Sequence, residues 1–242
     1  GGSFVDIVAP IIVGFLLLFF NWDLVLQINT IPTIILGLIF IRLAPMVIAP
    51  AQELGSGLNI RGFTKSVMKP GALAILLMII LHNMSLVAFM SMSPLYFQDV
   101  RGFSSGLTGV ALSLFLVGGA ITSPFIGHVS DKIGRKNMTI WGLVGGGICA
   151  WVLTLLSSYI TIFPVLILAG LLMLSIRPVI MAMALEKIGH RESTTLGLIS
   201  SLGEGFAAIG AILAGIFGDI DLSFAIILAA VFSILAGLVV IP

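Results

Sequence analysis

Five charged or titratable side chains and two glycines gather between two long apolar runs, in the stretch Gly-His-Val-Ser-Asp-Lys-Ile-Gly-Arg-Lys at residues 127–136. Asp131 can accept hydrogen bonds at the N-terminus of a neighbouring helix, where the helix dipole favours an anion. Arg135 can hold a carboxylate through two parallel N–H groups. Gly134 permits a tight reversal of the backbone, and Gly127 allows a second helix to approach closely. These residues predict a charged contact that fastens helix ends together.

The basic residues of this stretch also have a simpler interpretation, in which Lys132, Arg135 and Lys136 only anchor the chain in its orientation. If the stretch is cytoplasmic, Arg101 lies on the opposite side and Arg177 within an apolar run. The other nine basic residues fall on the cytoplasmic side, in agreement with the positive-inside rule. They are Arg42, Arg61, Lys65, Lys69, Lys132, Arg135, Lys136, Lys187 and Arg191.

Four polar side chains interrupt the apolar runs themselves: His82, Asn83, Arg177 and Glu204. A charge at bilayer depth costs roughly 2.5–3.5 kcal/mol on insertion scales, so it should face a cavity or a partner. At about 1.5 Å per helical residue, His82, Arg177 and Glu204 all lie near the midplane of the membrane. We therefore predict that Arg177 and Glu204 approach each other across two helices.

Glu204 belongs to a small, polar helix face that can line an aqueous cavity and that also contains Gly197, Ser201, Ala208 and Ala211. Desolvation favours the neutral acid unless Arg177 pairs with it, so binding a proton can switch the pairing. The alternative is a fixed structural ion pair. For His82 and Asn83 the alternative is an ordinary hydrogen bond to a neighbouring helix.

The composition places these residues in a membrane protein. Hydrophobic residues make up 59% of the chain and charged residues 9%, against roughly 25% charged in soluble domains. Continuous apolar runs of about 20 residues predict membrane helices rather than barrel strands. Eight such runs lie near residues 3–20, 24–43, 71–95, 106–127, 138–157, 161–184, 195–217 and 222–241.

Breaks and close contacts within these helices can also be predicted. Pro178 leaves the carbonyl of Leu174 without its helical donor, so we expect a kink or another donor beside Arg177, and Pro124 affects Ala120 in the same way. Glycines in two apolar runs should serve close packing of helices. They are Gly142, Gly145, Gly146 and Gly147 in one run, and Gly205, Gly210 and Gly215 in another.

Other function classes find little support in the sequence. The net charge of +1 does not favour nucleic-acid binding, and Cys149 is the only cysteine. His128 and His190 are expected in loops without metal-ligand spacing, and no nucleotide-binding motif is present. We therefore expect no metal, no cofactor and no enzymatic activity. Two other classes of membrane protein stay open at this point. They are a receptor or scaffold that transports nothing, and a membrane-embedded enzyme that uses the midplane polar residues.

The pattern G-x-x-x-D-K-x-G-R-K closely resembles the cytoplasmic loop signature of the major facilitator superfamily, whose members are secondary transporters with one copy in each half of a twelve-helix fold. The resemblance implies that Gly127, Asp131, Gly134 and Arg135 latch the cytoplasmic side shut in the outward-facing state. It also implies a register. Residues 1–43 correspond to family helices five and six, residues 44–70 to the cytoplasmic linker, and residues 71–242 to the C-terminal six-helix half.

We thus expect an all-α, polytopic membrane bundle with eight membrane helices, lacking family helices one to four. The predicted function is proton-coupled transport of a small molecule across the cell membrane by alternating access, with protons, lipids and the missing N-terminal helices as partners. Export is favoured because Pro10 and Gly14 resemble part of the G-P-x-x-G-G element of antiporters. Uptake of a sugar or an organic anion is the alternative.

Overall fold

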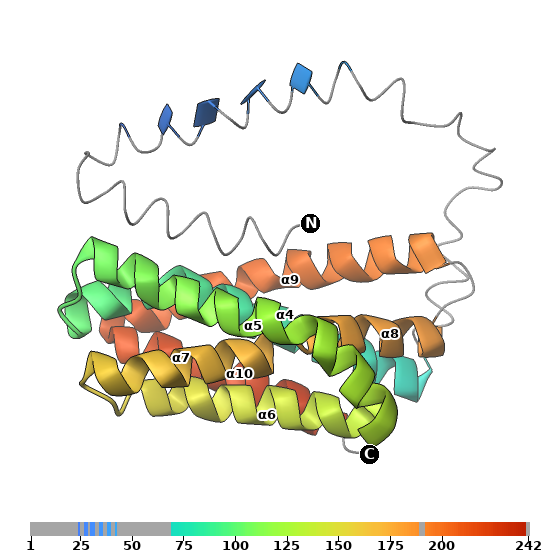
Figure 1. Ribbon diagram of the computed structural model, residues 1–242. Helices are drawn as coiled ribbons and strands as arrows, with labels where there is room; N and C mark the ends of the chain where they lie inside the picture. Colours follow the sequence, from blue (N-terminus) through green and yellow to red (C-terminus); the bar gives the residue numbers. More distant parts are fainter. Residues whose placement is uncertain are drawn as a thin grey trace.

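The computed structural model describes residues 69–188 and 192–240, together with ten separate helical positions between residues 24 and 42. The two long stretches contain α-helices and one π-helix, and no strand (Figure 1). The class is therefore all-α, as predicted. The elements are α4 (Pro70–Leu95), η1 (Tyr96–Val100, the π-helix), α5 (Ser105–Ile133), α6 (Arg135–Leu153), α7 (Tyr159–Met173), α8 (Arg177–Ile188), α9 (Glu192–Ile220) and α10 (Leu222–Leu238).

Each predicted apolar run after residue 70 falls on helical structure, although the run at 161–184 is divided between α7 and α8. In the described part of the chain, four helical segments are long and apolar enough to cross a membrane: Gly71–Val100, Ser105–Ser123, Tyr159–Lys187 and Ile199–Ile220. Leu222–Leu238 is a shorter apolar helix. The total of eight spans stays a prediction. The run at 3–20 and the linker up to residue 68 lie outside the described residues.

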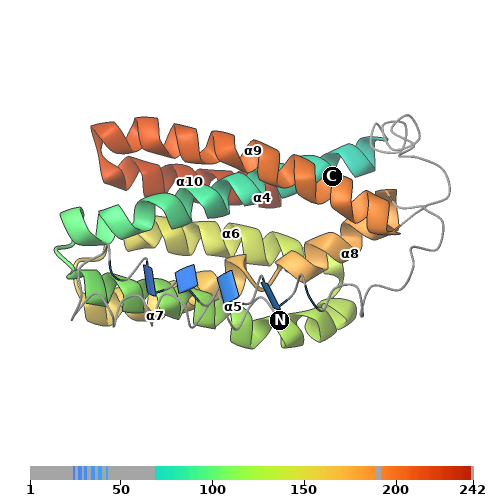
Figure 2. The same cartoon turned by 90° about the horizontal axis from the view of Figure 1, so that it is seen from above.

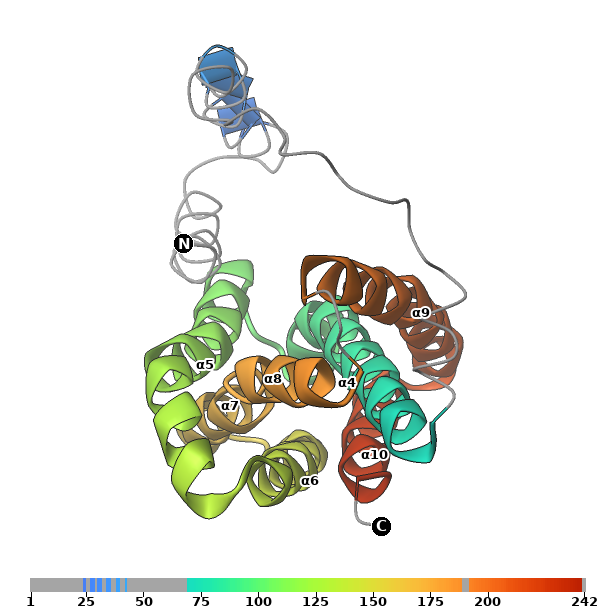
Figure 3. The same cartoon turned by 90° about the vertical axis from the view of Figure 1, so that its right-hand side faces the viewer.

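The helices form a bundle in which α4 packs between α9 and α10, α10 packs against α6, α6 against α7, and α7 against α5. Figure 2 shows α4, α9 and α10 along one edge and α5 and α7 along the other. Viewed along the helices in Figure 3, α6 and α10 lie together on one side of the bundle, whereas α5, α8, α4 and α9 follow one another on the other side. Most residues expected to carry function belong to this second group of helices, whereas Arg135 is the first residue of α6.

Glycines allow the helices to approach at backbone distance. A Cβ added to Gly170 of α7 would overlap the backbone carbonyl of Phe115 in α5. A Cβ on Gly147 of α6 would lie 2.7 Å from the carbonyl oxygen of Ala230, and one on Gly210 of α9 would lie 2.6 Å from that of Met84. In lipid the hydrophobic effect does not drive helices together, so close packing at such glycines stabilises the bundle instead.

The glycine predictions are confirmed for Gly147 and Gly210, and for Gly142, Gly145 and Gly146 of α6, which contact Leu172, Met173 or Ile176 at the α7–α8 junction. Among the described residues, no atom of another helix lies within 4 Å of a Cβ added to Gly205 or Gly215, so close packing there stays a prediction. Both lie on a different face of α9 from Gly203 and Gly210, which pack on α4.

The buried apolar residues divide into two clusters. The Phe89 core includes Leu86 and Phe89 of α4 and Met173 of α7, whereas the Ile180 core includes Ile79 of α4 and Ile180 of α8. Five of the buried polar residues lie between the two clusters along the chain, and we call them the polar layer: His82, Asn83 and Ser85 of α4, Ser175 between α7 and α8, and Ser233 of α10. The polar layer therefore crosses the middle of the bundle.

The break between α7 and α8 occurs at the level of this polar layer. Leu174, Ser175 and Ile176 form a turn, and the backbone N–H of Arg177 donates to the carbonyl of Leu174 at 3.3 Å. The prediction of an altered hydrogen bond beside Arg177 is thus confirmed, because the ring of Pro178 carries no N–H to donate. By contrast, α5 runs as one helix across Pro124.

Close packing at Gly170 can be tested by adding one methyl group. We expect Gly170→Ala to destabilise the protein by about 1–3 kcal/mol, because the new Cβ forces α7 away from the backbone of α5. The matched control is Gly215→Ala, which should change stability by less than about 1 kcal/mol, since alanine is the better helix former. Thermal unfolding followed by circular dichroism in detergent measures both. Equal unfolding temperatures for the two variants would contradict the packing argument.

Candidate functional site

The reversal between α5 and α6 takes place at a single residue, Gly134. The predicted apolar runs 106–127 and 138–157 left residues 128–137 as a loop, but the structure corrects this, because residues 128–133 belong to α5 and residues 135–137 to α6. Gly134 has φ +97°, and its N–H donates to the carbonyl of Ser130 at 2.9 Å. A residue with a Cβ is strained at such a φ, so the tight reversal expected of Gly134 is confirmed.

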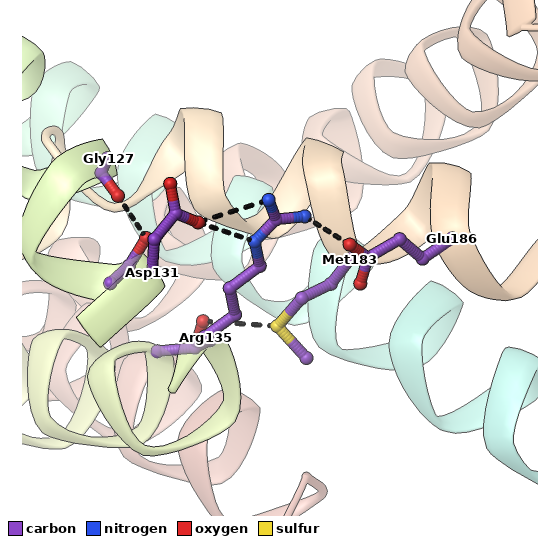
Figure 4. A network of polar contacts seen from close by, with 7 residues as sticks. Gly127, Asp131, Arg135, Met183 and Glu186 are labelled. Carbon is purple, nitrogen blue, oxygen red and sulfur yellow. Dashed lines mark hydrogen bonds and ion pairs between the residues drawn. The ribbon is translucent and has the colours of Figure 1, made fainter. Parts of the chain in front are cut away.

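This reversal brings Arg135 beside two carboxylates (Figure 4). Its Nε and Nη2 donate to the same oxygen, Oδ1 of Asp131, at 3.2 and 3.1 Å. Its Nη1 donates to a carboxylate oxygen of Glu186 near the end of α8. We call Asp131, Arg135 and Glu186 the latch. It joins the α5–α6 reversal to the end of α8.

The latch is exposed enough to open easily. The Arg135 side chain is 33% exposed, and both carboxylate side chains are 60% exposed. Exposed ion pairs contribute about 0–1 kcal/mol, because water competes for the charges. The latch can therefore orient α8 against α5 without locking it there.

Two features in and near the latch were not predicted as the structure has them. Glu186 was missed as a partner of Arg135; the available signal was an acidic residue just beyond the apolar run 161–184, and nothing in the sequence directs it to Arg135. Gly127 was expected to allow close approach of a helix, but no atom of the described residues lies within 4 Å of a Cβ there. Its carbonyl instead accepts a hydrogen bond from the Ser130 hydroxyl at 2.7 Å. Close approach of a helix at Gly127 therefore stays a prediction.

Arg177 and Glu204 meet as expected, with 2.9 Å between Nη2 of Arg177 and Oε1 of Glu204. The pair connects the first residue of α8, directly after the break, to the middle of α9. Its two side chains are 50% and 55% exposed, so the pair lies open on the bundle surface. Ser201, one turn earlier on α9, is exposed as well. Contact and exposure are observed, while a role in proton coupling stays a prediction.

His82 and Asn83 lie behind this surface, 1% and 5% exposed. Neither ring nitrogen of His82 nor Nδ2 of Asn83 has a hydrogen-bond partner among the described residues. Asn83 packs on Gly203 of α9, where an added Cβ would lie 2.5 Å from Nδ2. The ordinary hydrogen bond to a neighbouring helix that served as the alternative for these groups is therefore not observed. Among the described residues no group of three or more potential metal ligands occurs either.

The bundle, its apolar helices and its small set of charged contacts define a multi-pass membrane protein. A family model of the Major Facilitator Superfamily matches residues 102–242, which is 141 of the 242 residues. The chain belongs to this superfamily, as the signature at 127–136 predicted, and is accordingly a secondary transporter for a small molecule rather than an enzyme. Among curated proteins, none matches the chain.

The latch can be tested without knowing the substrate. We expect Arg135→Ala to speed hydrogen–deuterium exchange about two- to fivefold in the last turns of α5 and α8, because it removes a contact worth up to about 1 kcal/mol. Transport by the intact protein should slow, while membrane insertion stays unchanged.

The matched control for the latch is Lys132→Ala, which removes a neighbouring exposed cation that forms no ion pair among the described residues. Its exchange rates should equal those of the wild type. Combining Arg135→Ala with Glu186→Gln should add little to Arg135→Ala alone, since both changes remove the same contact. Wild-type exchange in Arg135→Ala would leave only the anchoring role for this side chain.

Proposed function

We propose that this protein is a proton-coupled secondary transporter of the cell membrane, that it works by alternating access, and that it exports its small-molecule substrate. The observation that carries the proposal is the Arg177–Glu204 pair, an ion pair at 2.9 Å between half-exposed side chains in the middle of apolar helices. Transporters of this kind bind substrate and coupling ion near the midplane.

The pair can exist in two states. Ionised Glu204 pairs with Arg177, which offsets the cost of both charges at membrane depth. A proton that binds Glu204 removes the attraction and leaves the guanidinium free to move. Arg177 is the first residue of α8, directly after the break that separates α8 from α7. It can therefore move without moving α7. Proton binding can therefore shift α8 relative to α9.

The remaining parts of the fold take complementary roles in this proposal. Residues 71–242 form the C-terminal half, residues 44–70 the cytoplasmic linker, and residues 1–43 the last two helices of the N-terminal half. Alternating access requires both halves to rock about a shared site, so family helices one to four are needed as well. The latch closes the cytoplasmic side in the outward-facing state, and Ser201 with its small neighbours lines the cavity beside Glu204.

Two alternatives to export remain testable. Uptake of an organic anion is favoured by the exposed guanidinium of Arg177, which can hold a carboxylate once Glu204 is neutral. A non-transporting receptor would need no charges in the middle of its apolar helices, so the Arg177–Glu204 pair argues against it.

Glu204→Gln tests the coupling role in the intact protein, because it keeps the size of the side chain and removes the titrating charge. We expect proteoliposomes with an imposed proton gradient to lose uphill movement of the probe, while exchange of the probe across the membrane continues. Ethidium serves as the probe for export and lactate as the probe for uptake.

Asp219→Asn is the matched control, since it removes a carboxylate from the far end of the same helix, α9. It should leave uphill transport unchanged. If Glu204→Gln retains pH-dependent uphill transport of the probe, the coupling role of Glu204 is wrong.

A further inference from the structure

His82 is a buried imidazole with both nitrogens unpaired, in the middle of a helix that packs against α8 and α9. Only 1% of the residue is exposed. Leaving a buried polar group without a partner is costly, and native proteins rarely do so. An unpaired buried imidazole in the polar layer therefore indicates a partner that arrives in another state of the protein.

The position of His82 limits what that partner can be. On α4, Ile79 belongs to the Ile180 core and Leu86 to the Phe89 core, so His82 lies between the two apolar cores. The two apolar cores lie on either side of His82 along α4. A polar partner can therefore reach His82 only within the polar layer. In that layer α8 contributes Arg177, and α9 contributes Glu204 beside Gly203.

The helices packed against α4 carry few charged groups at the level of the polar layer. α10 contributes none, and α5 contributes charged groups only near its end, at residues 128–132. On α8, Glu186 and Lys187 lie at the opposite end from Arg177, and Asp219 lies near the far end of α9. Among the described residues of α8, Arg177 is the charged side chain at this level, two residues after Ser175 of the polar layer.

We propose that His82 is the second acceptor for Arg177: when proton binding neutralises Glu204, the guanidinium exchanges Glu204 for an unpaired ring nitrogen of His82. This inference rests on the proposed coupling role of Glu204 and adds a positioning residue to it. His82 does not carry the transported proton. It receives the arginine that the proton displaces.

The exchange is balanced in charge and in hydrogen bonds. Arg177 has five N–H donors, and the structure uses Nη2 for Glu204. A neutral imidazole offers one acceptor nitrogen, which suits an N–H donor of a guanidinium. The proton binds the Glu204 carboxylate, Arg177 keeps its charge, and the hydrogen bond lost at Glu204 is replaced at His82. Proton release reverses each step.

Nitrogen-15 NMR of histidine-labelled protein in nanodiscs tests the exchange directly. This chain has three histidines, and the His82 signals are assigned by their loss in His82→Gln. In the wild type at a pH that keeps Glu204 ionised, we expect both ring nitrogens to resonate as groups without hydrogen bonds. In Glu204→Leu, which removes the carboxylate acceptor, the acceptor nitrogen should move to a hydrogen-bonded position. Glu204→Gln should show the same change to a smaller extent.

The matched control combines Glu204→Leu with Arg177→Gln, and there the His82 signals should return toward the wild-type position. An unchanged His82 spectrum in Glu204→Leu overturns the proposal. So does a hydrogen-bonded signal in the wild type, which would indicate a bound water, or a shift that persists without Arg177. None of these outcomes depends on a transport assay, so they are distinguishable from failure of the proposed function.

Transport by the intact protein supplies a second readout. We expect His82→Phe, which fills the space without an acceptor, to slow proton-driven ethidium flux about tenfold, the effect of losing one hydrogen bond to a charged group. Exchange of ethidium should stay within about twofold of the wild type, since binding and rocking do not require the proton. His82→Gln, which keeps an acceptor oxygen, should retain most of the driven flux. Equal driven flux in His82→Phe and the wild type overturns the role of His82.

Discussion

Helices in lipid gain little from burying apolar side chains against one another, because the lipid tails are as apolar as leucine. The bundle depends instead on close backbone approach, and glycines make this possible. Gly170 brings α7 onto the backbone of α5, Gly147 brings α6 onto α10, and Gly210 brings α9 onto α4. Two residues of the polar layer also join helices, because the Ser85 hydroxyl donates to the carbonyl of Ala229 at 2.6 Å and the Ser233 hydroxyl donates to that of Leu143 at 2.7 Å. The ring nitrogens of His82, in the same layer, have no such partner among the described residues.

The same constraint explains where charge is tolerated. Polar side chains that include His82, Asn83 and Ser175 lie where the two apolar cores meet, near the break between α7 and α8. Arg177 and Glu204 lie on the open surface at this level, and His82 lies behind it without a partner. A half-exposed ion pair and a buried polar group thus occur at one level of the bundle, on helices that pack against each other.

The sequence predicted the helical class, the apolar runs beyond residue 70 and the meeting of Arg177 with Glu204, because hydropathy and the cost of isolated charges act locally or in pairs. It predicted the reversal at Gly134 but assigned it a loop of ten residues, since a single glycine at positive φ was not distinguishable from a polar connection. The faces of helices were less predictable. Gly205 and Gly215 follow the same small-residue pattern as Gly210, and only the packing of α4 shows which of them is covered. Glu186 was missed because its partner is distant along the chain.

The one-residue connection at Gly134 also has a mechanical meaning. A flexible loop would absorb the displacement of one helix before it reached the next, but α5 and α6 meet with no slack between them. A tilt of the end of α5 should therefore also displace the start of α6. Arg135, the first residue after Gly134, moves with it. The position of the Arg135 guanidinium, which contacts α8, therefore depends on the angle between α5 and α6. The end of α8 can respond to changes in this angle that a longer connection would have damped.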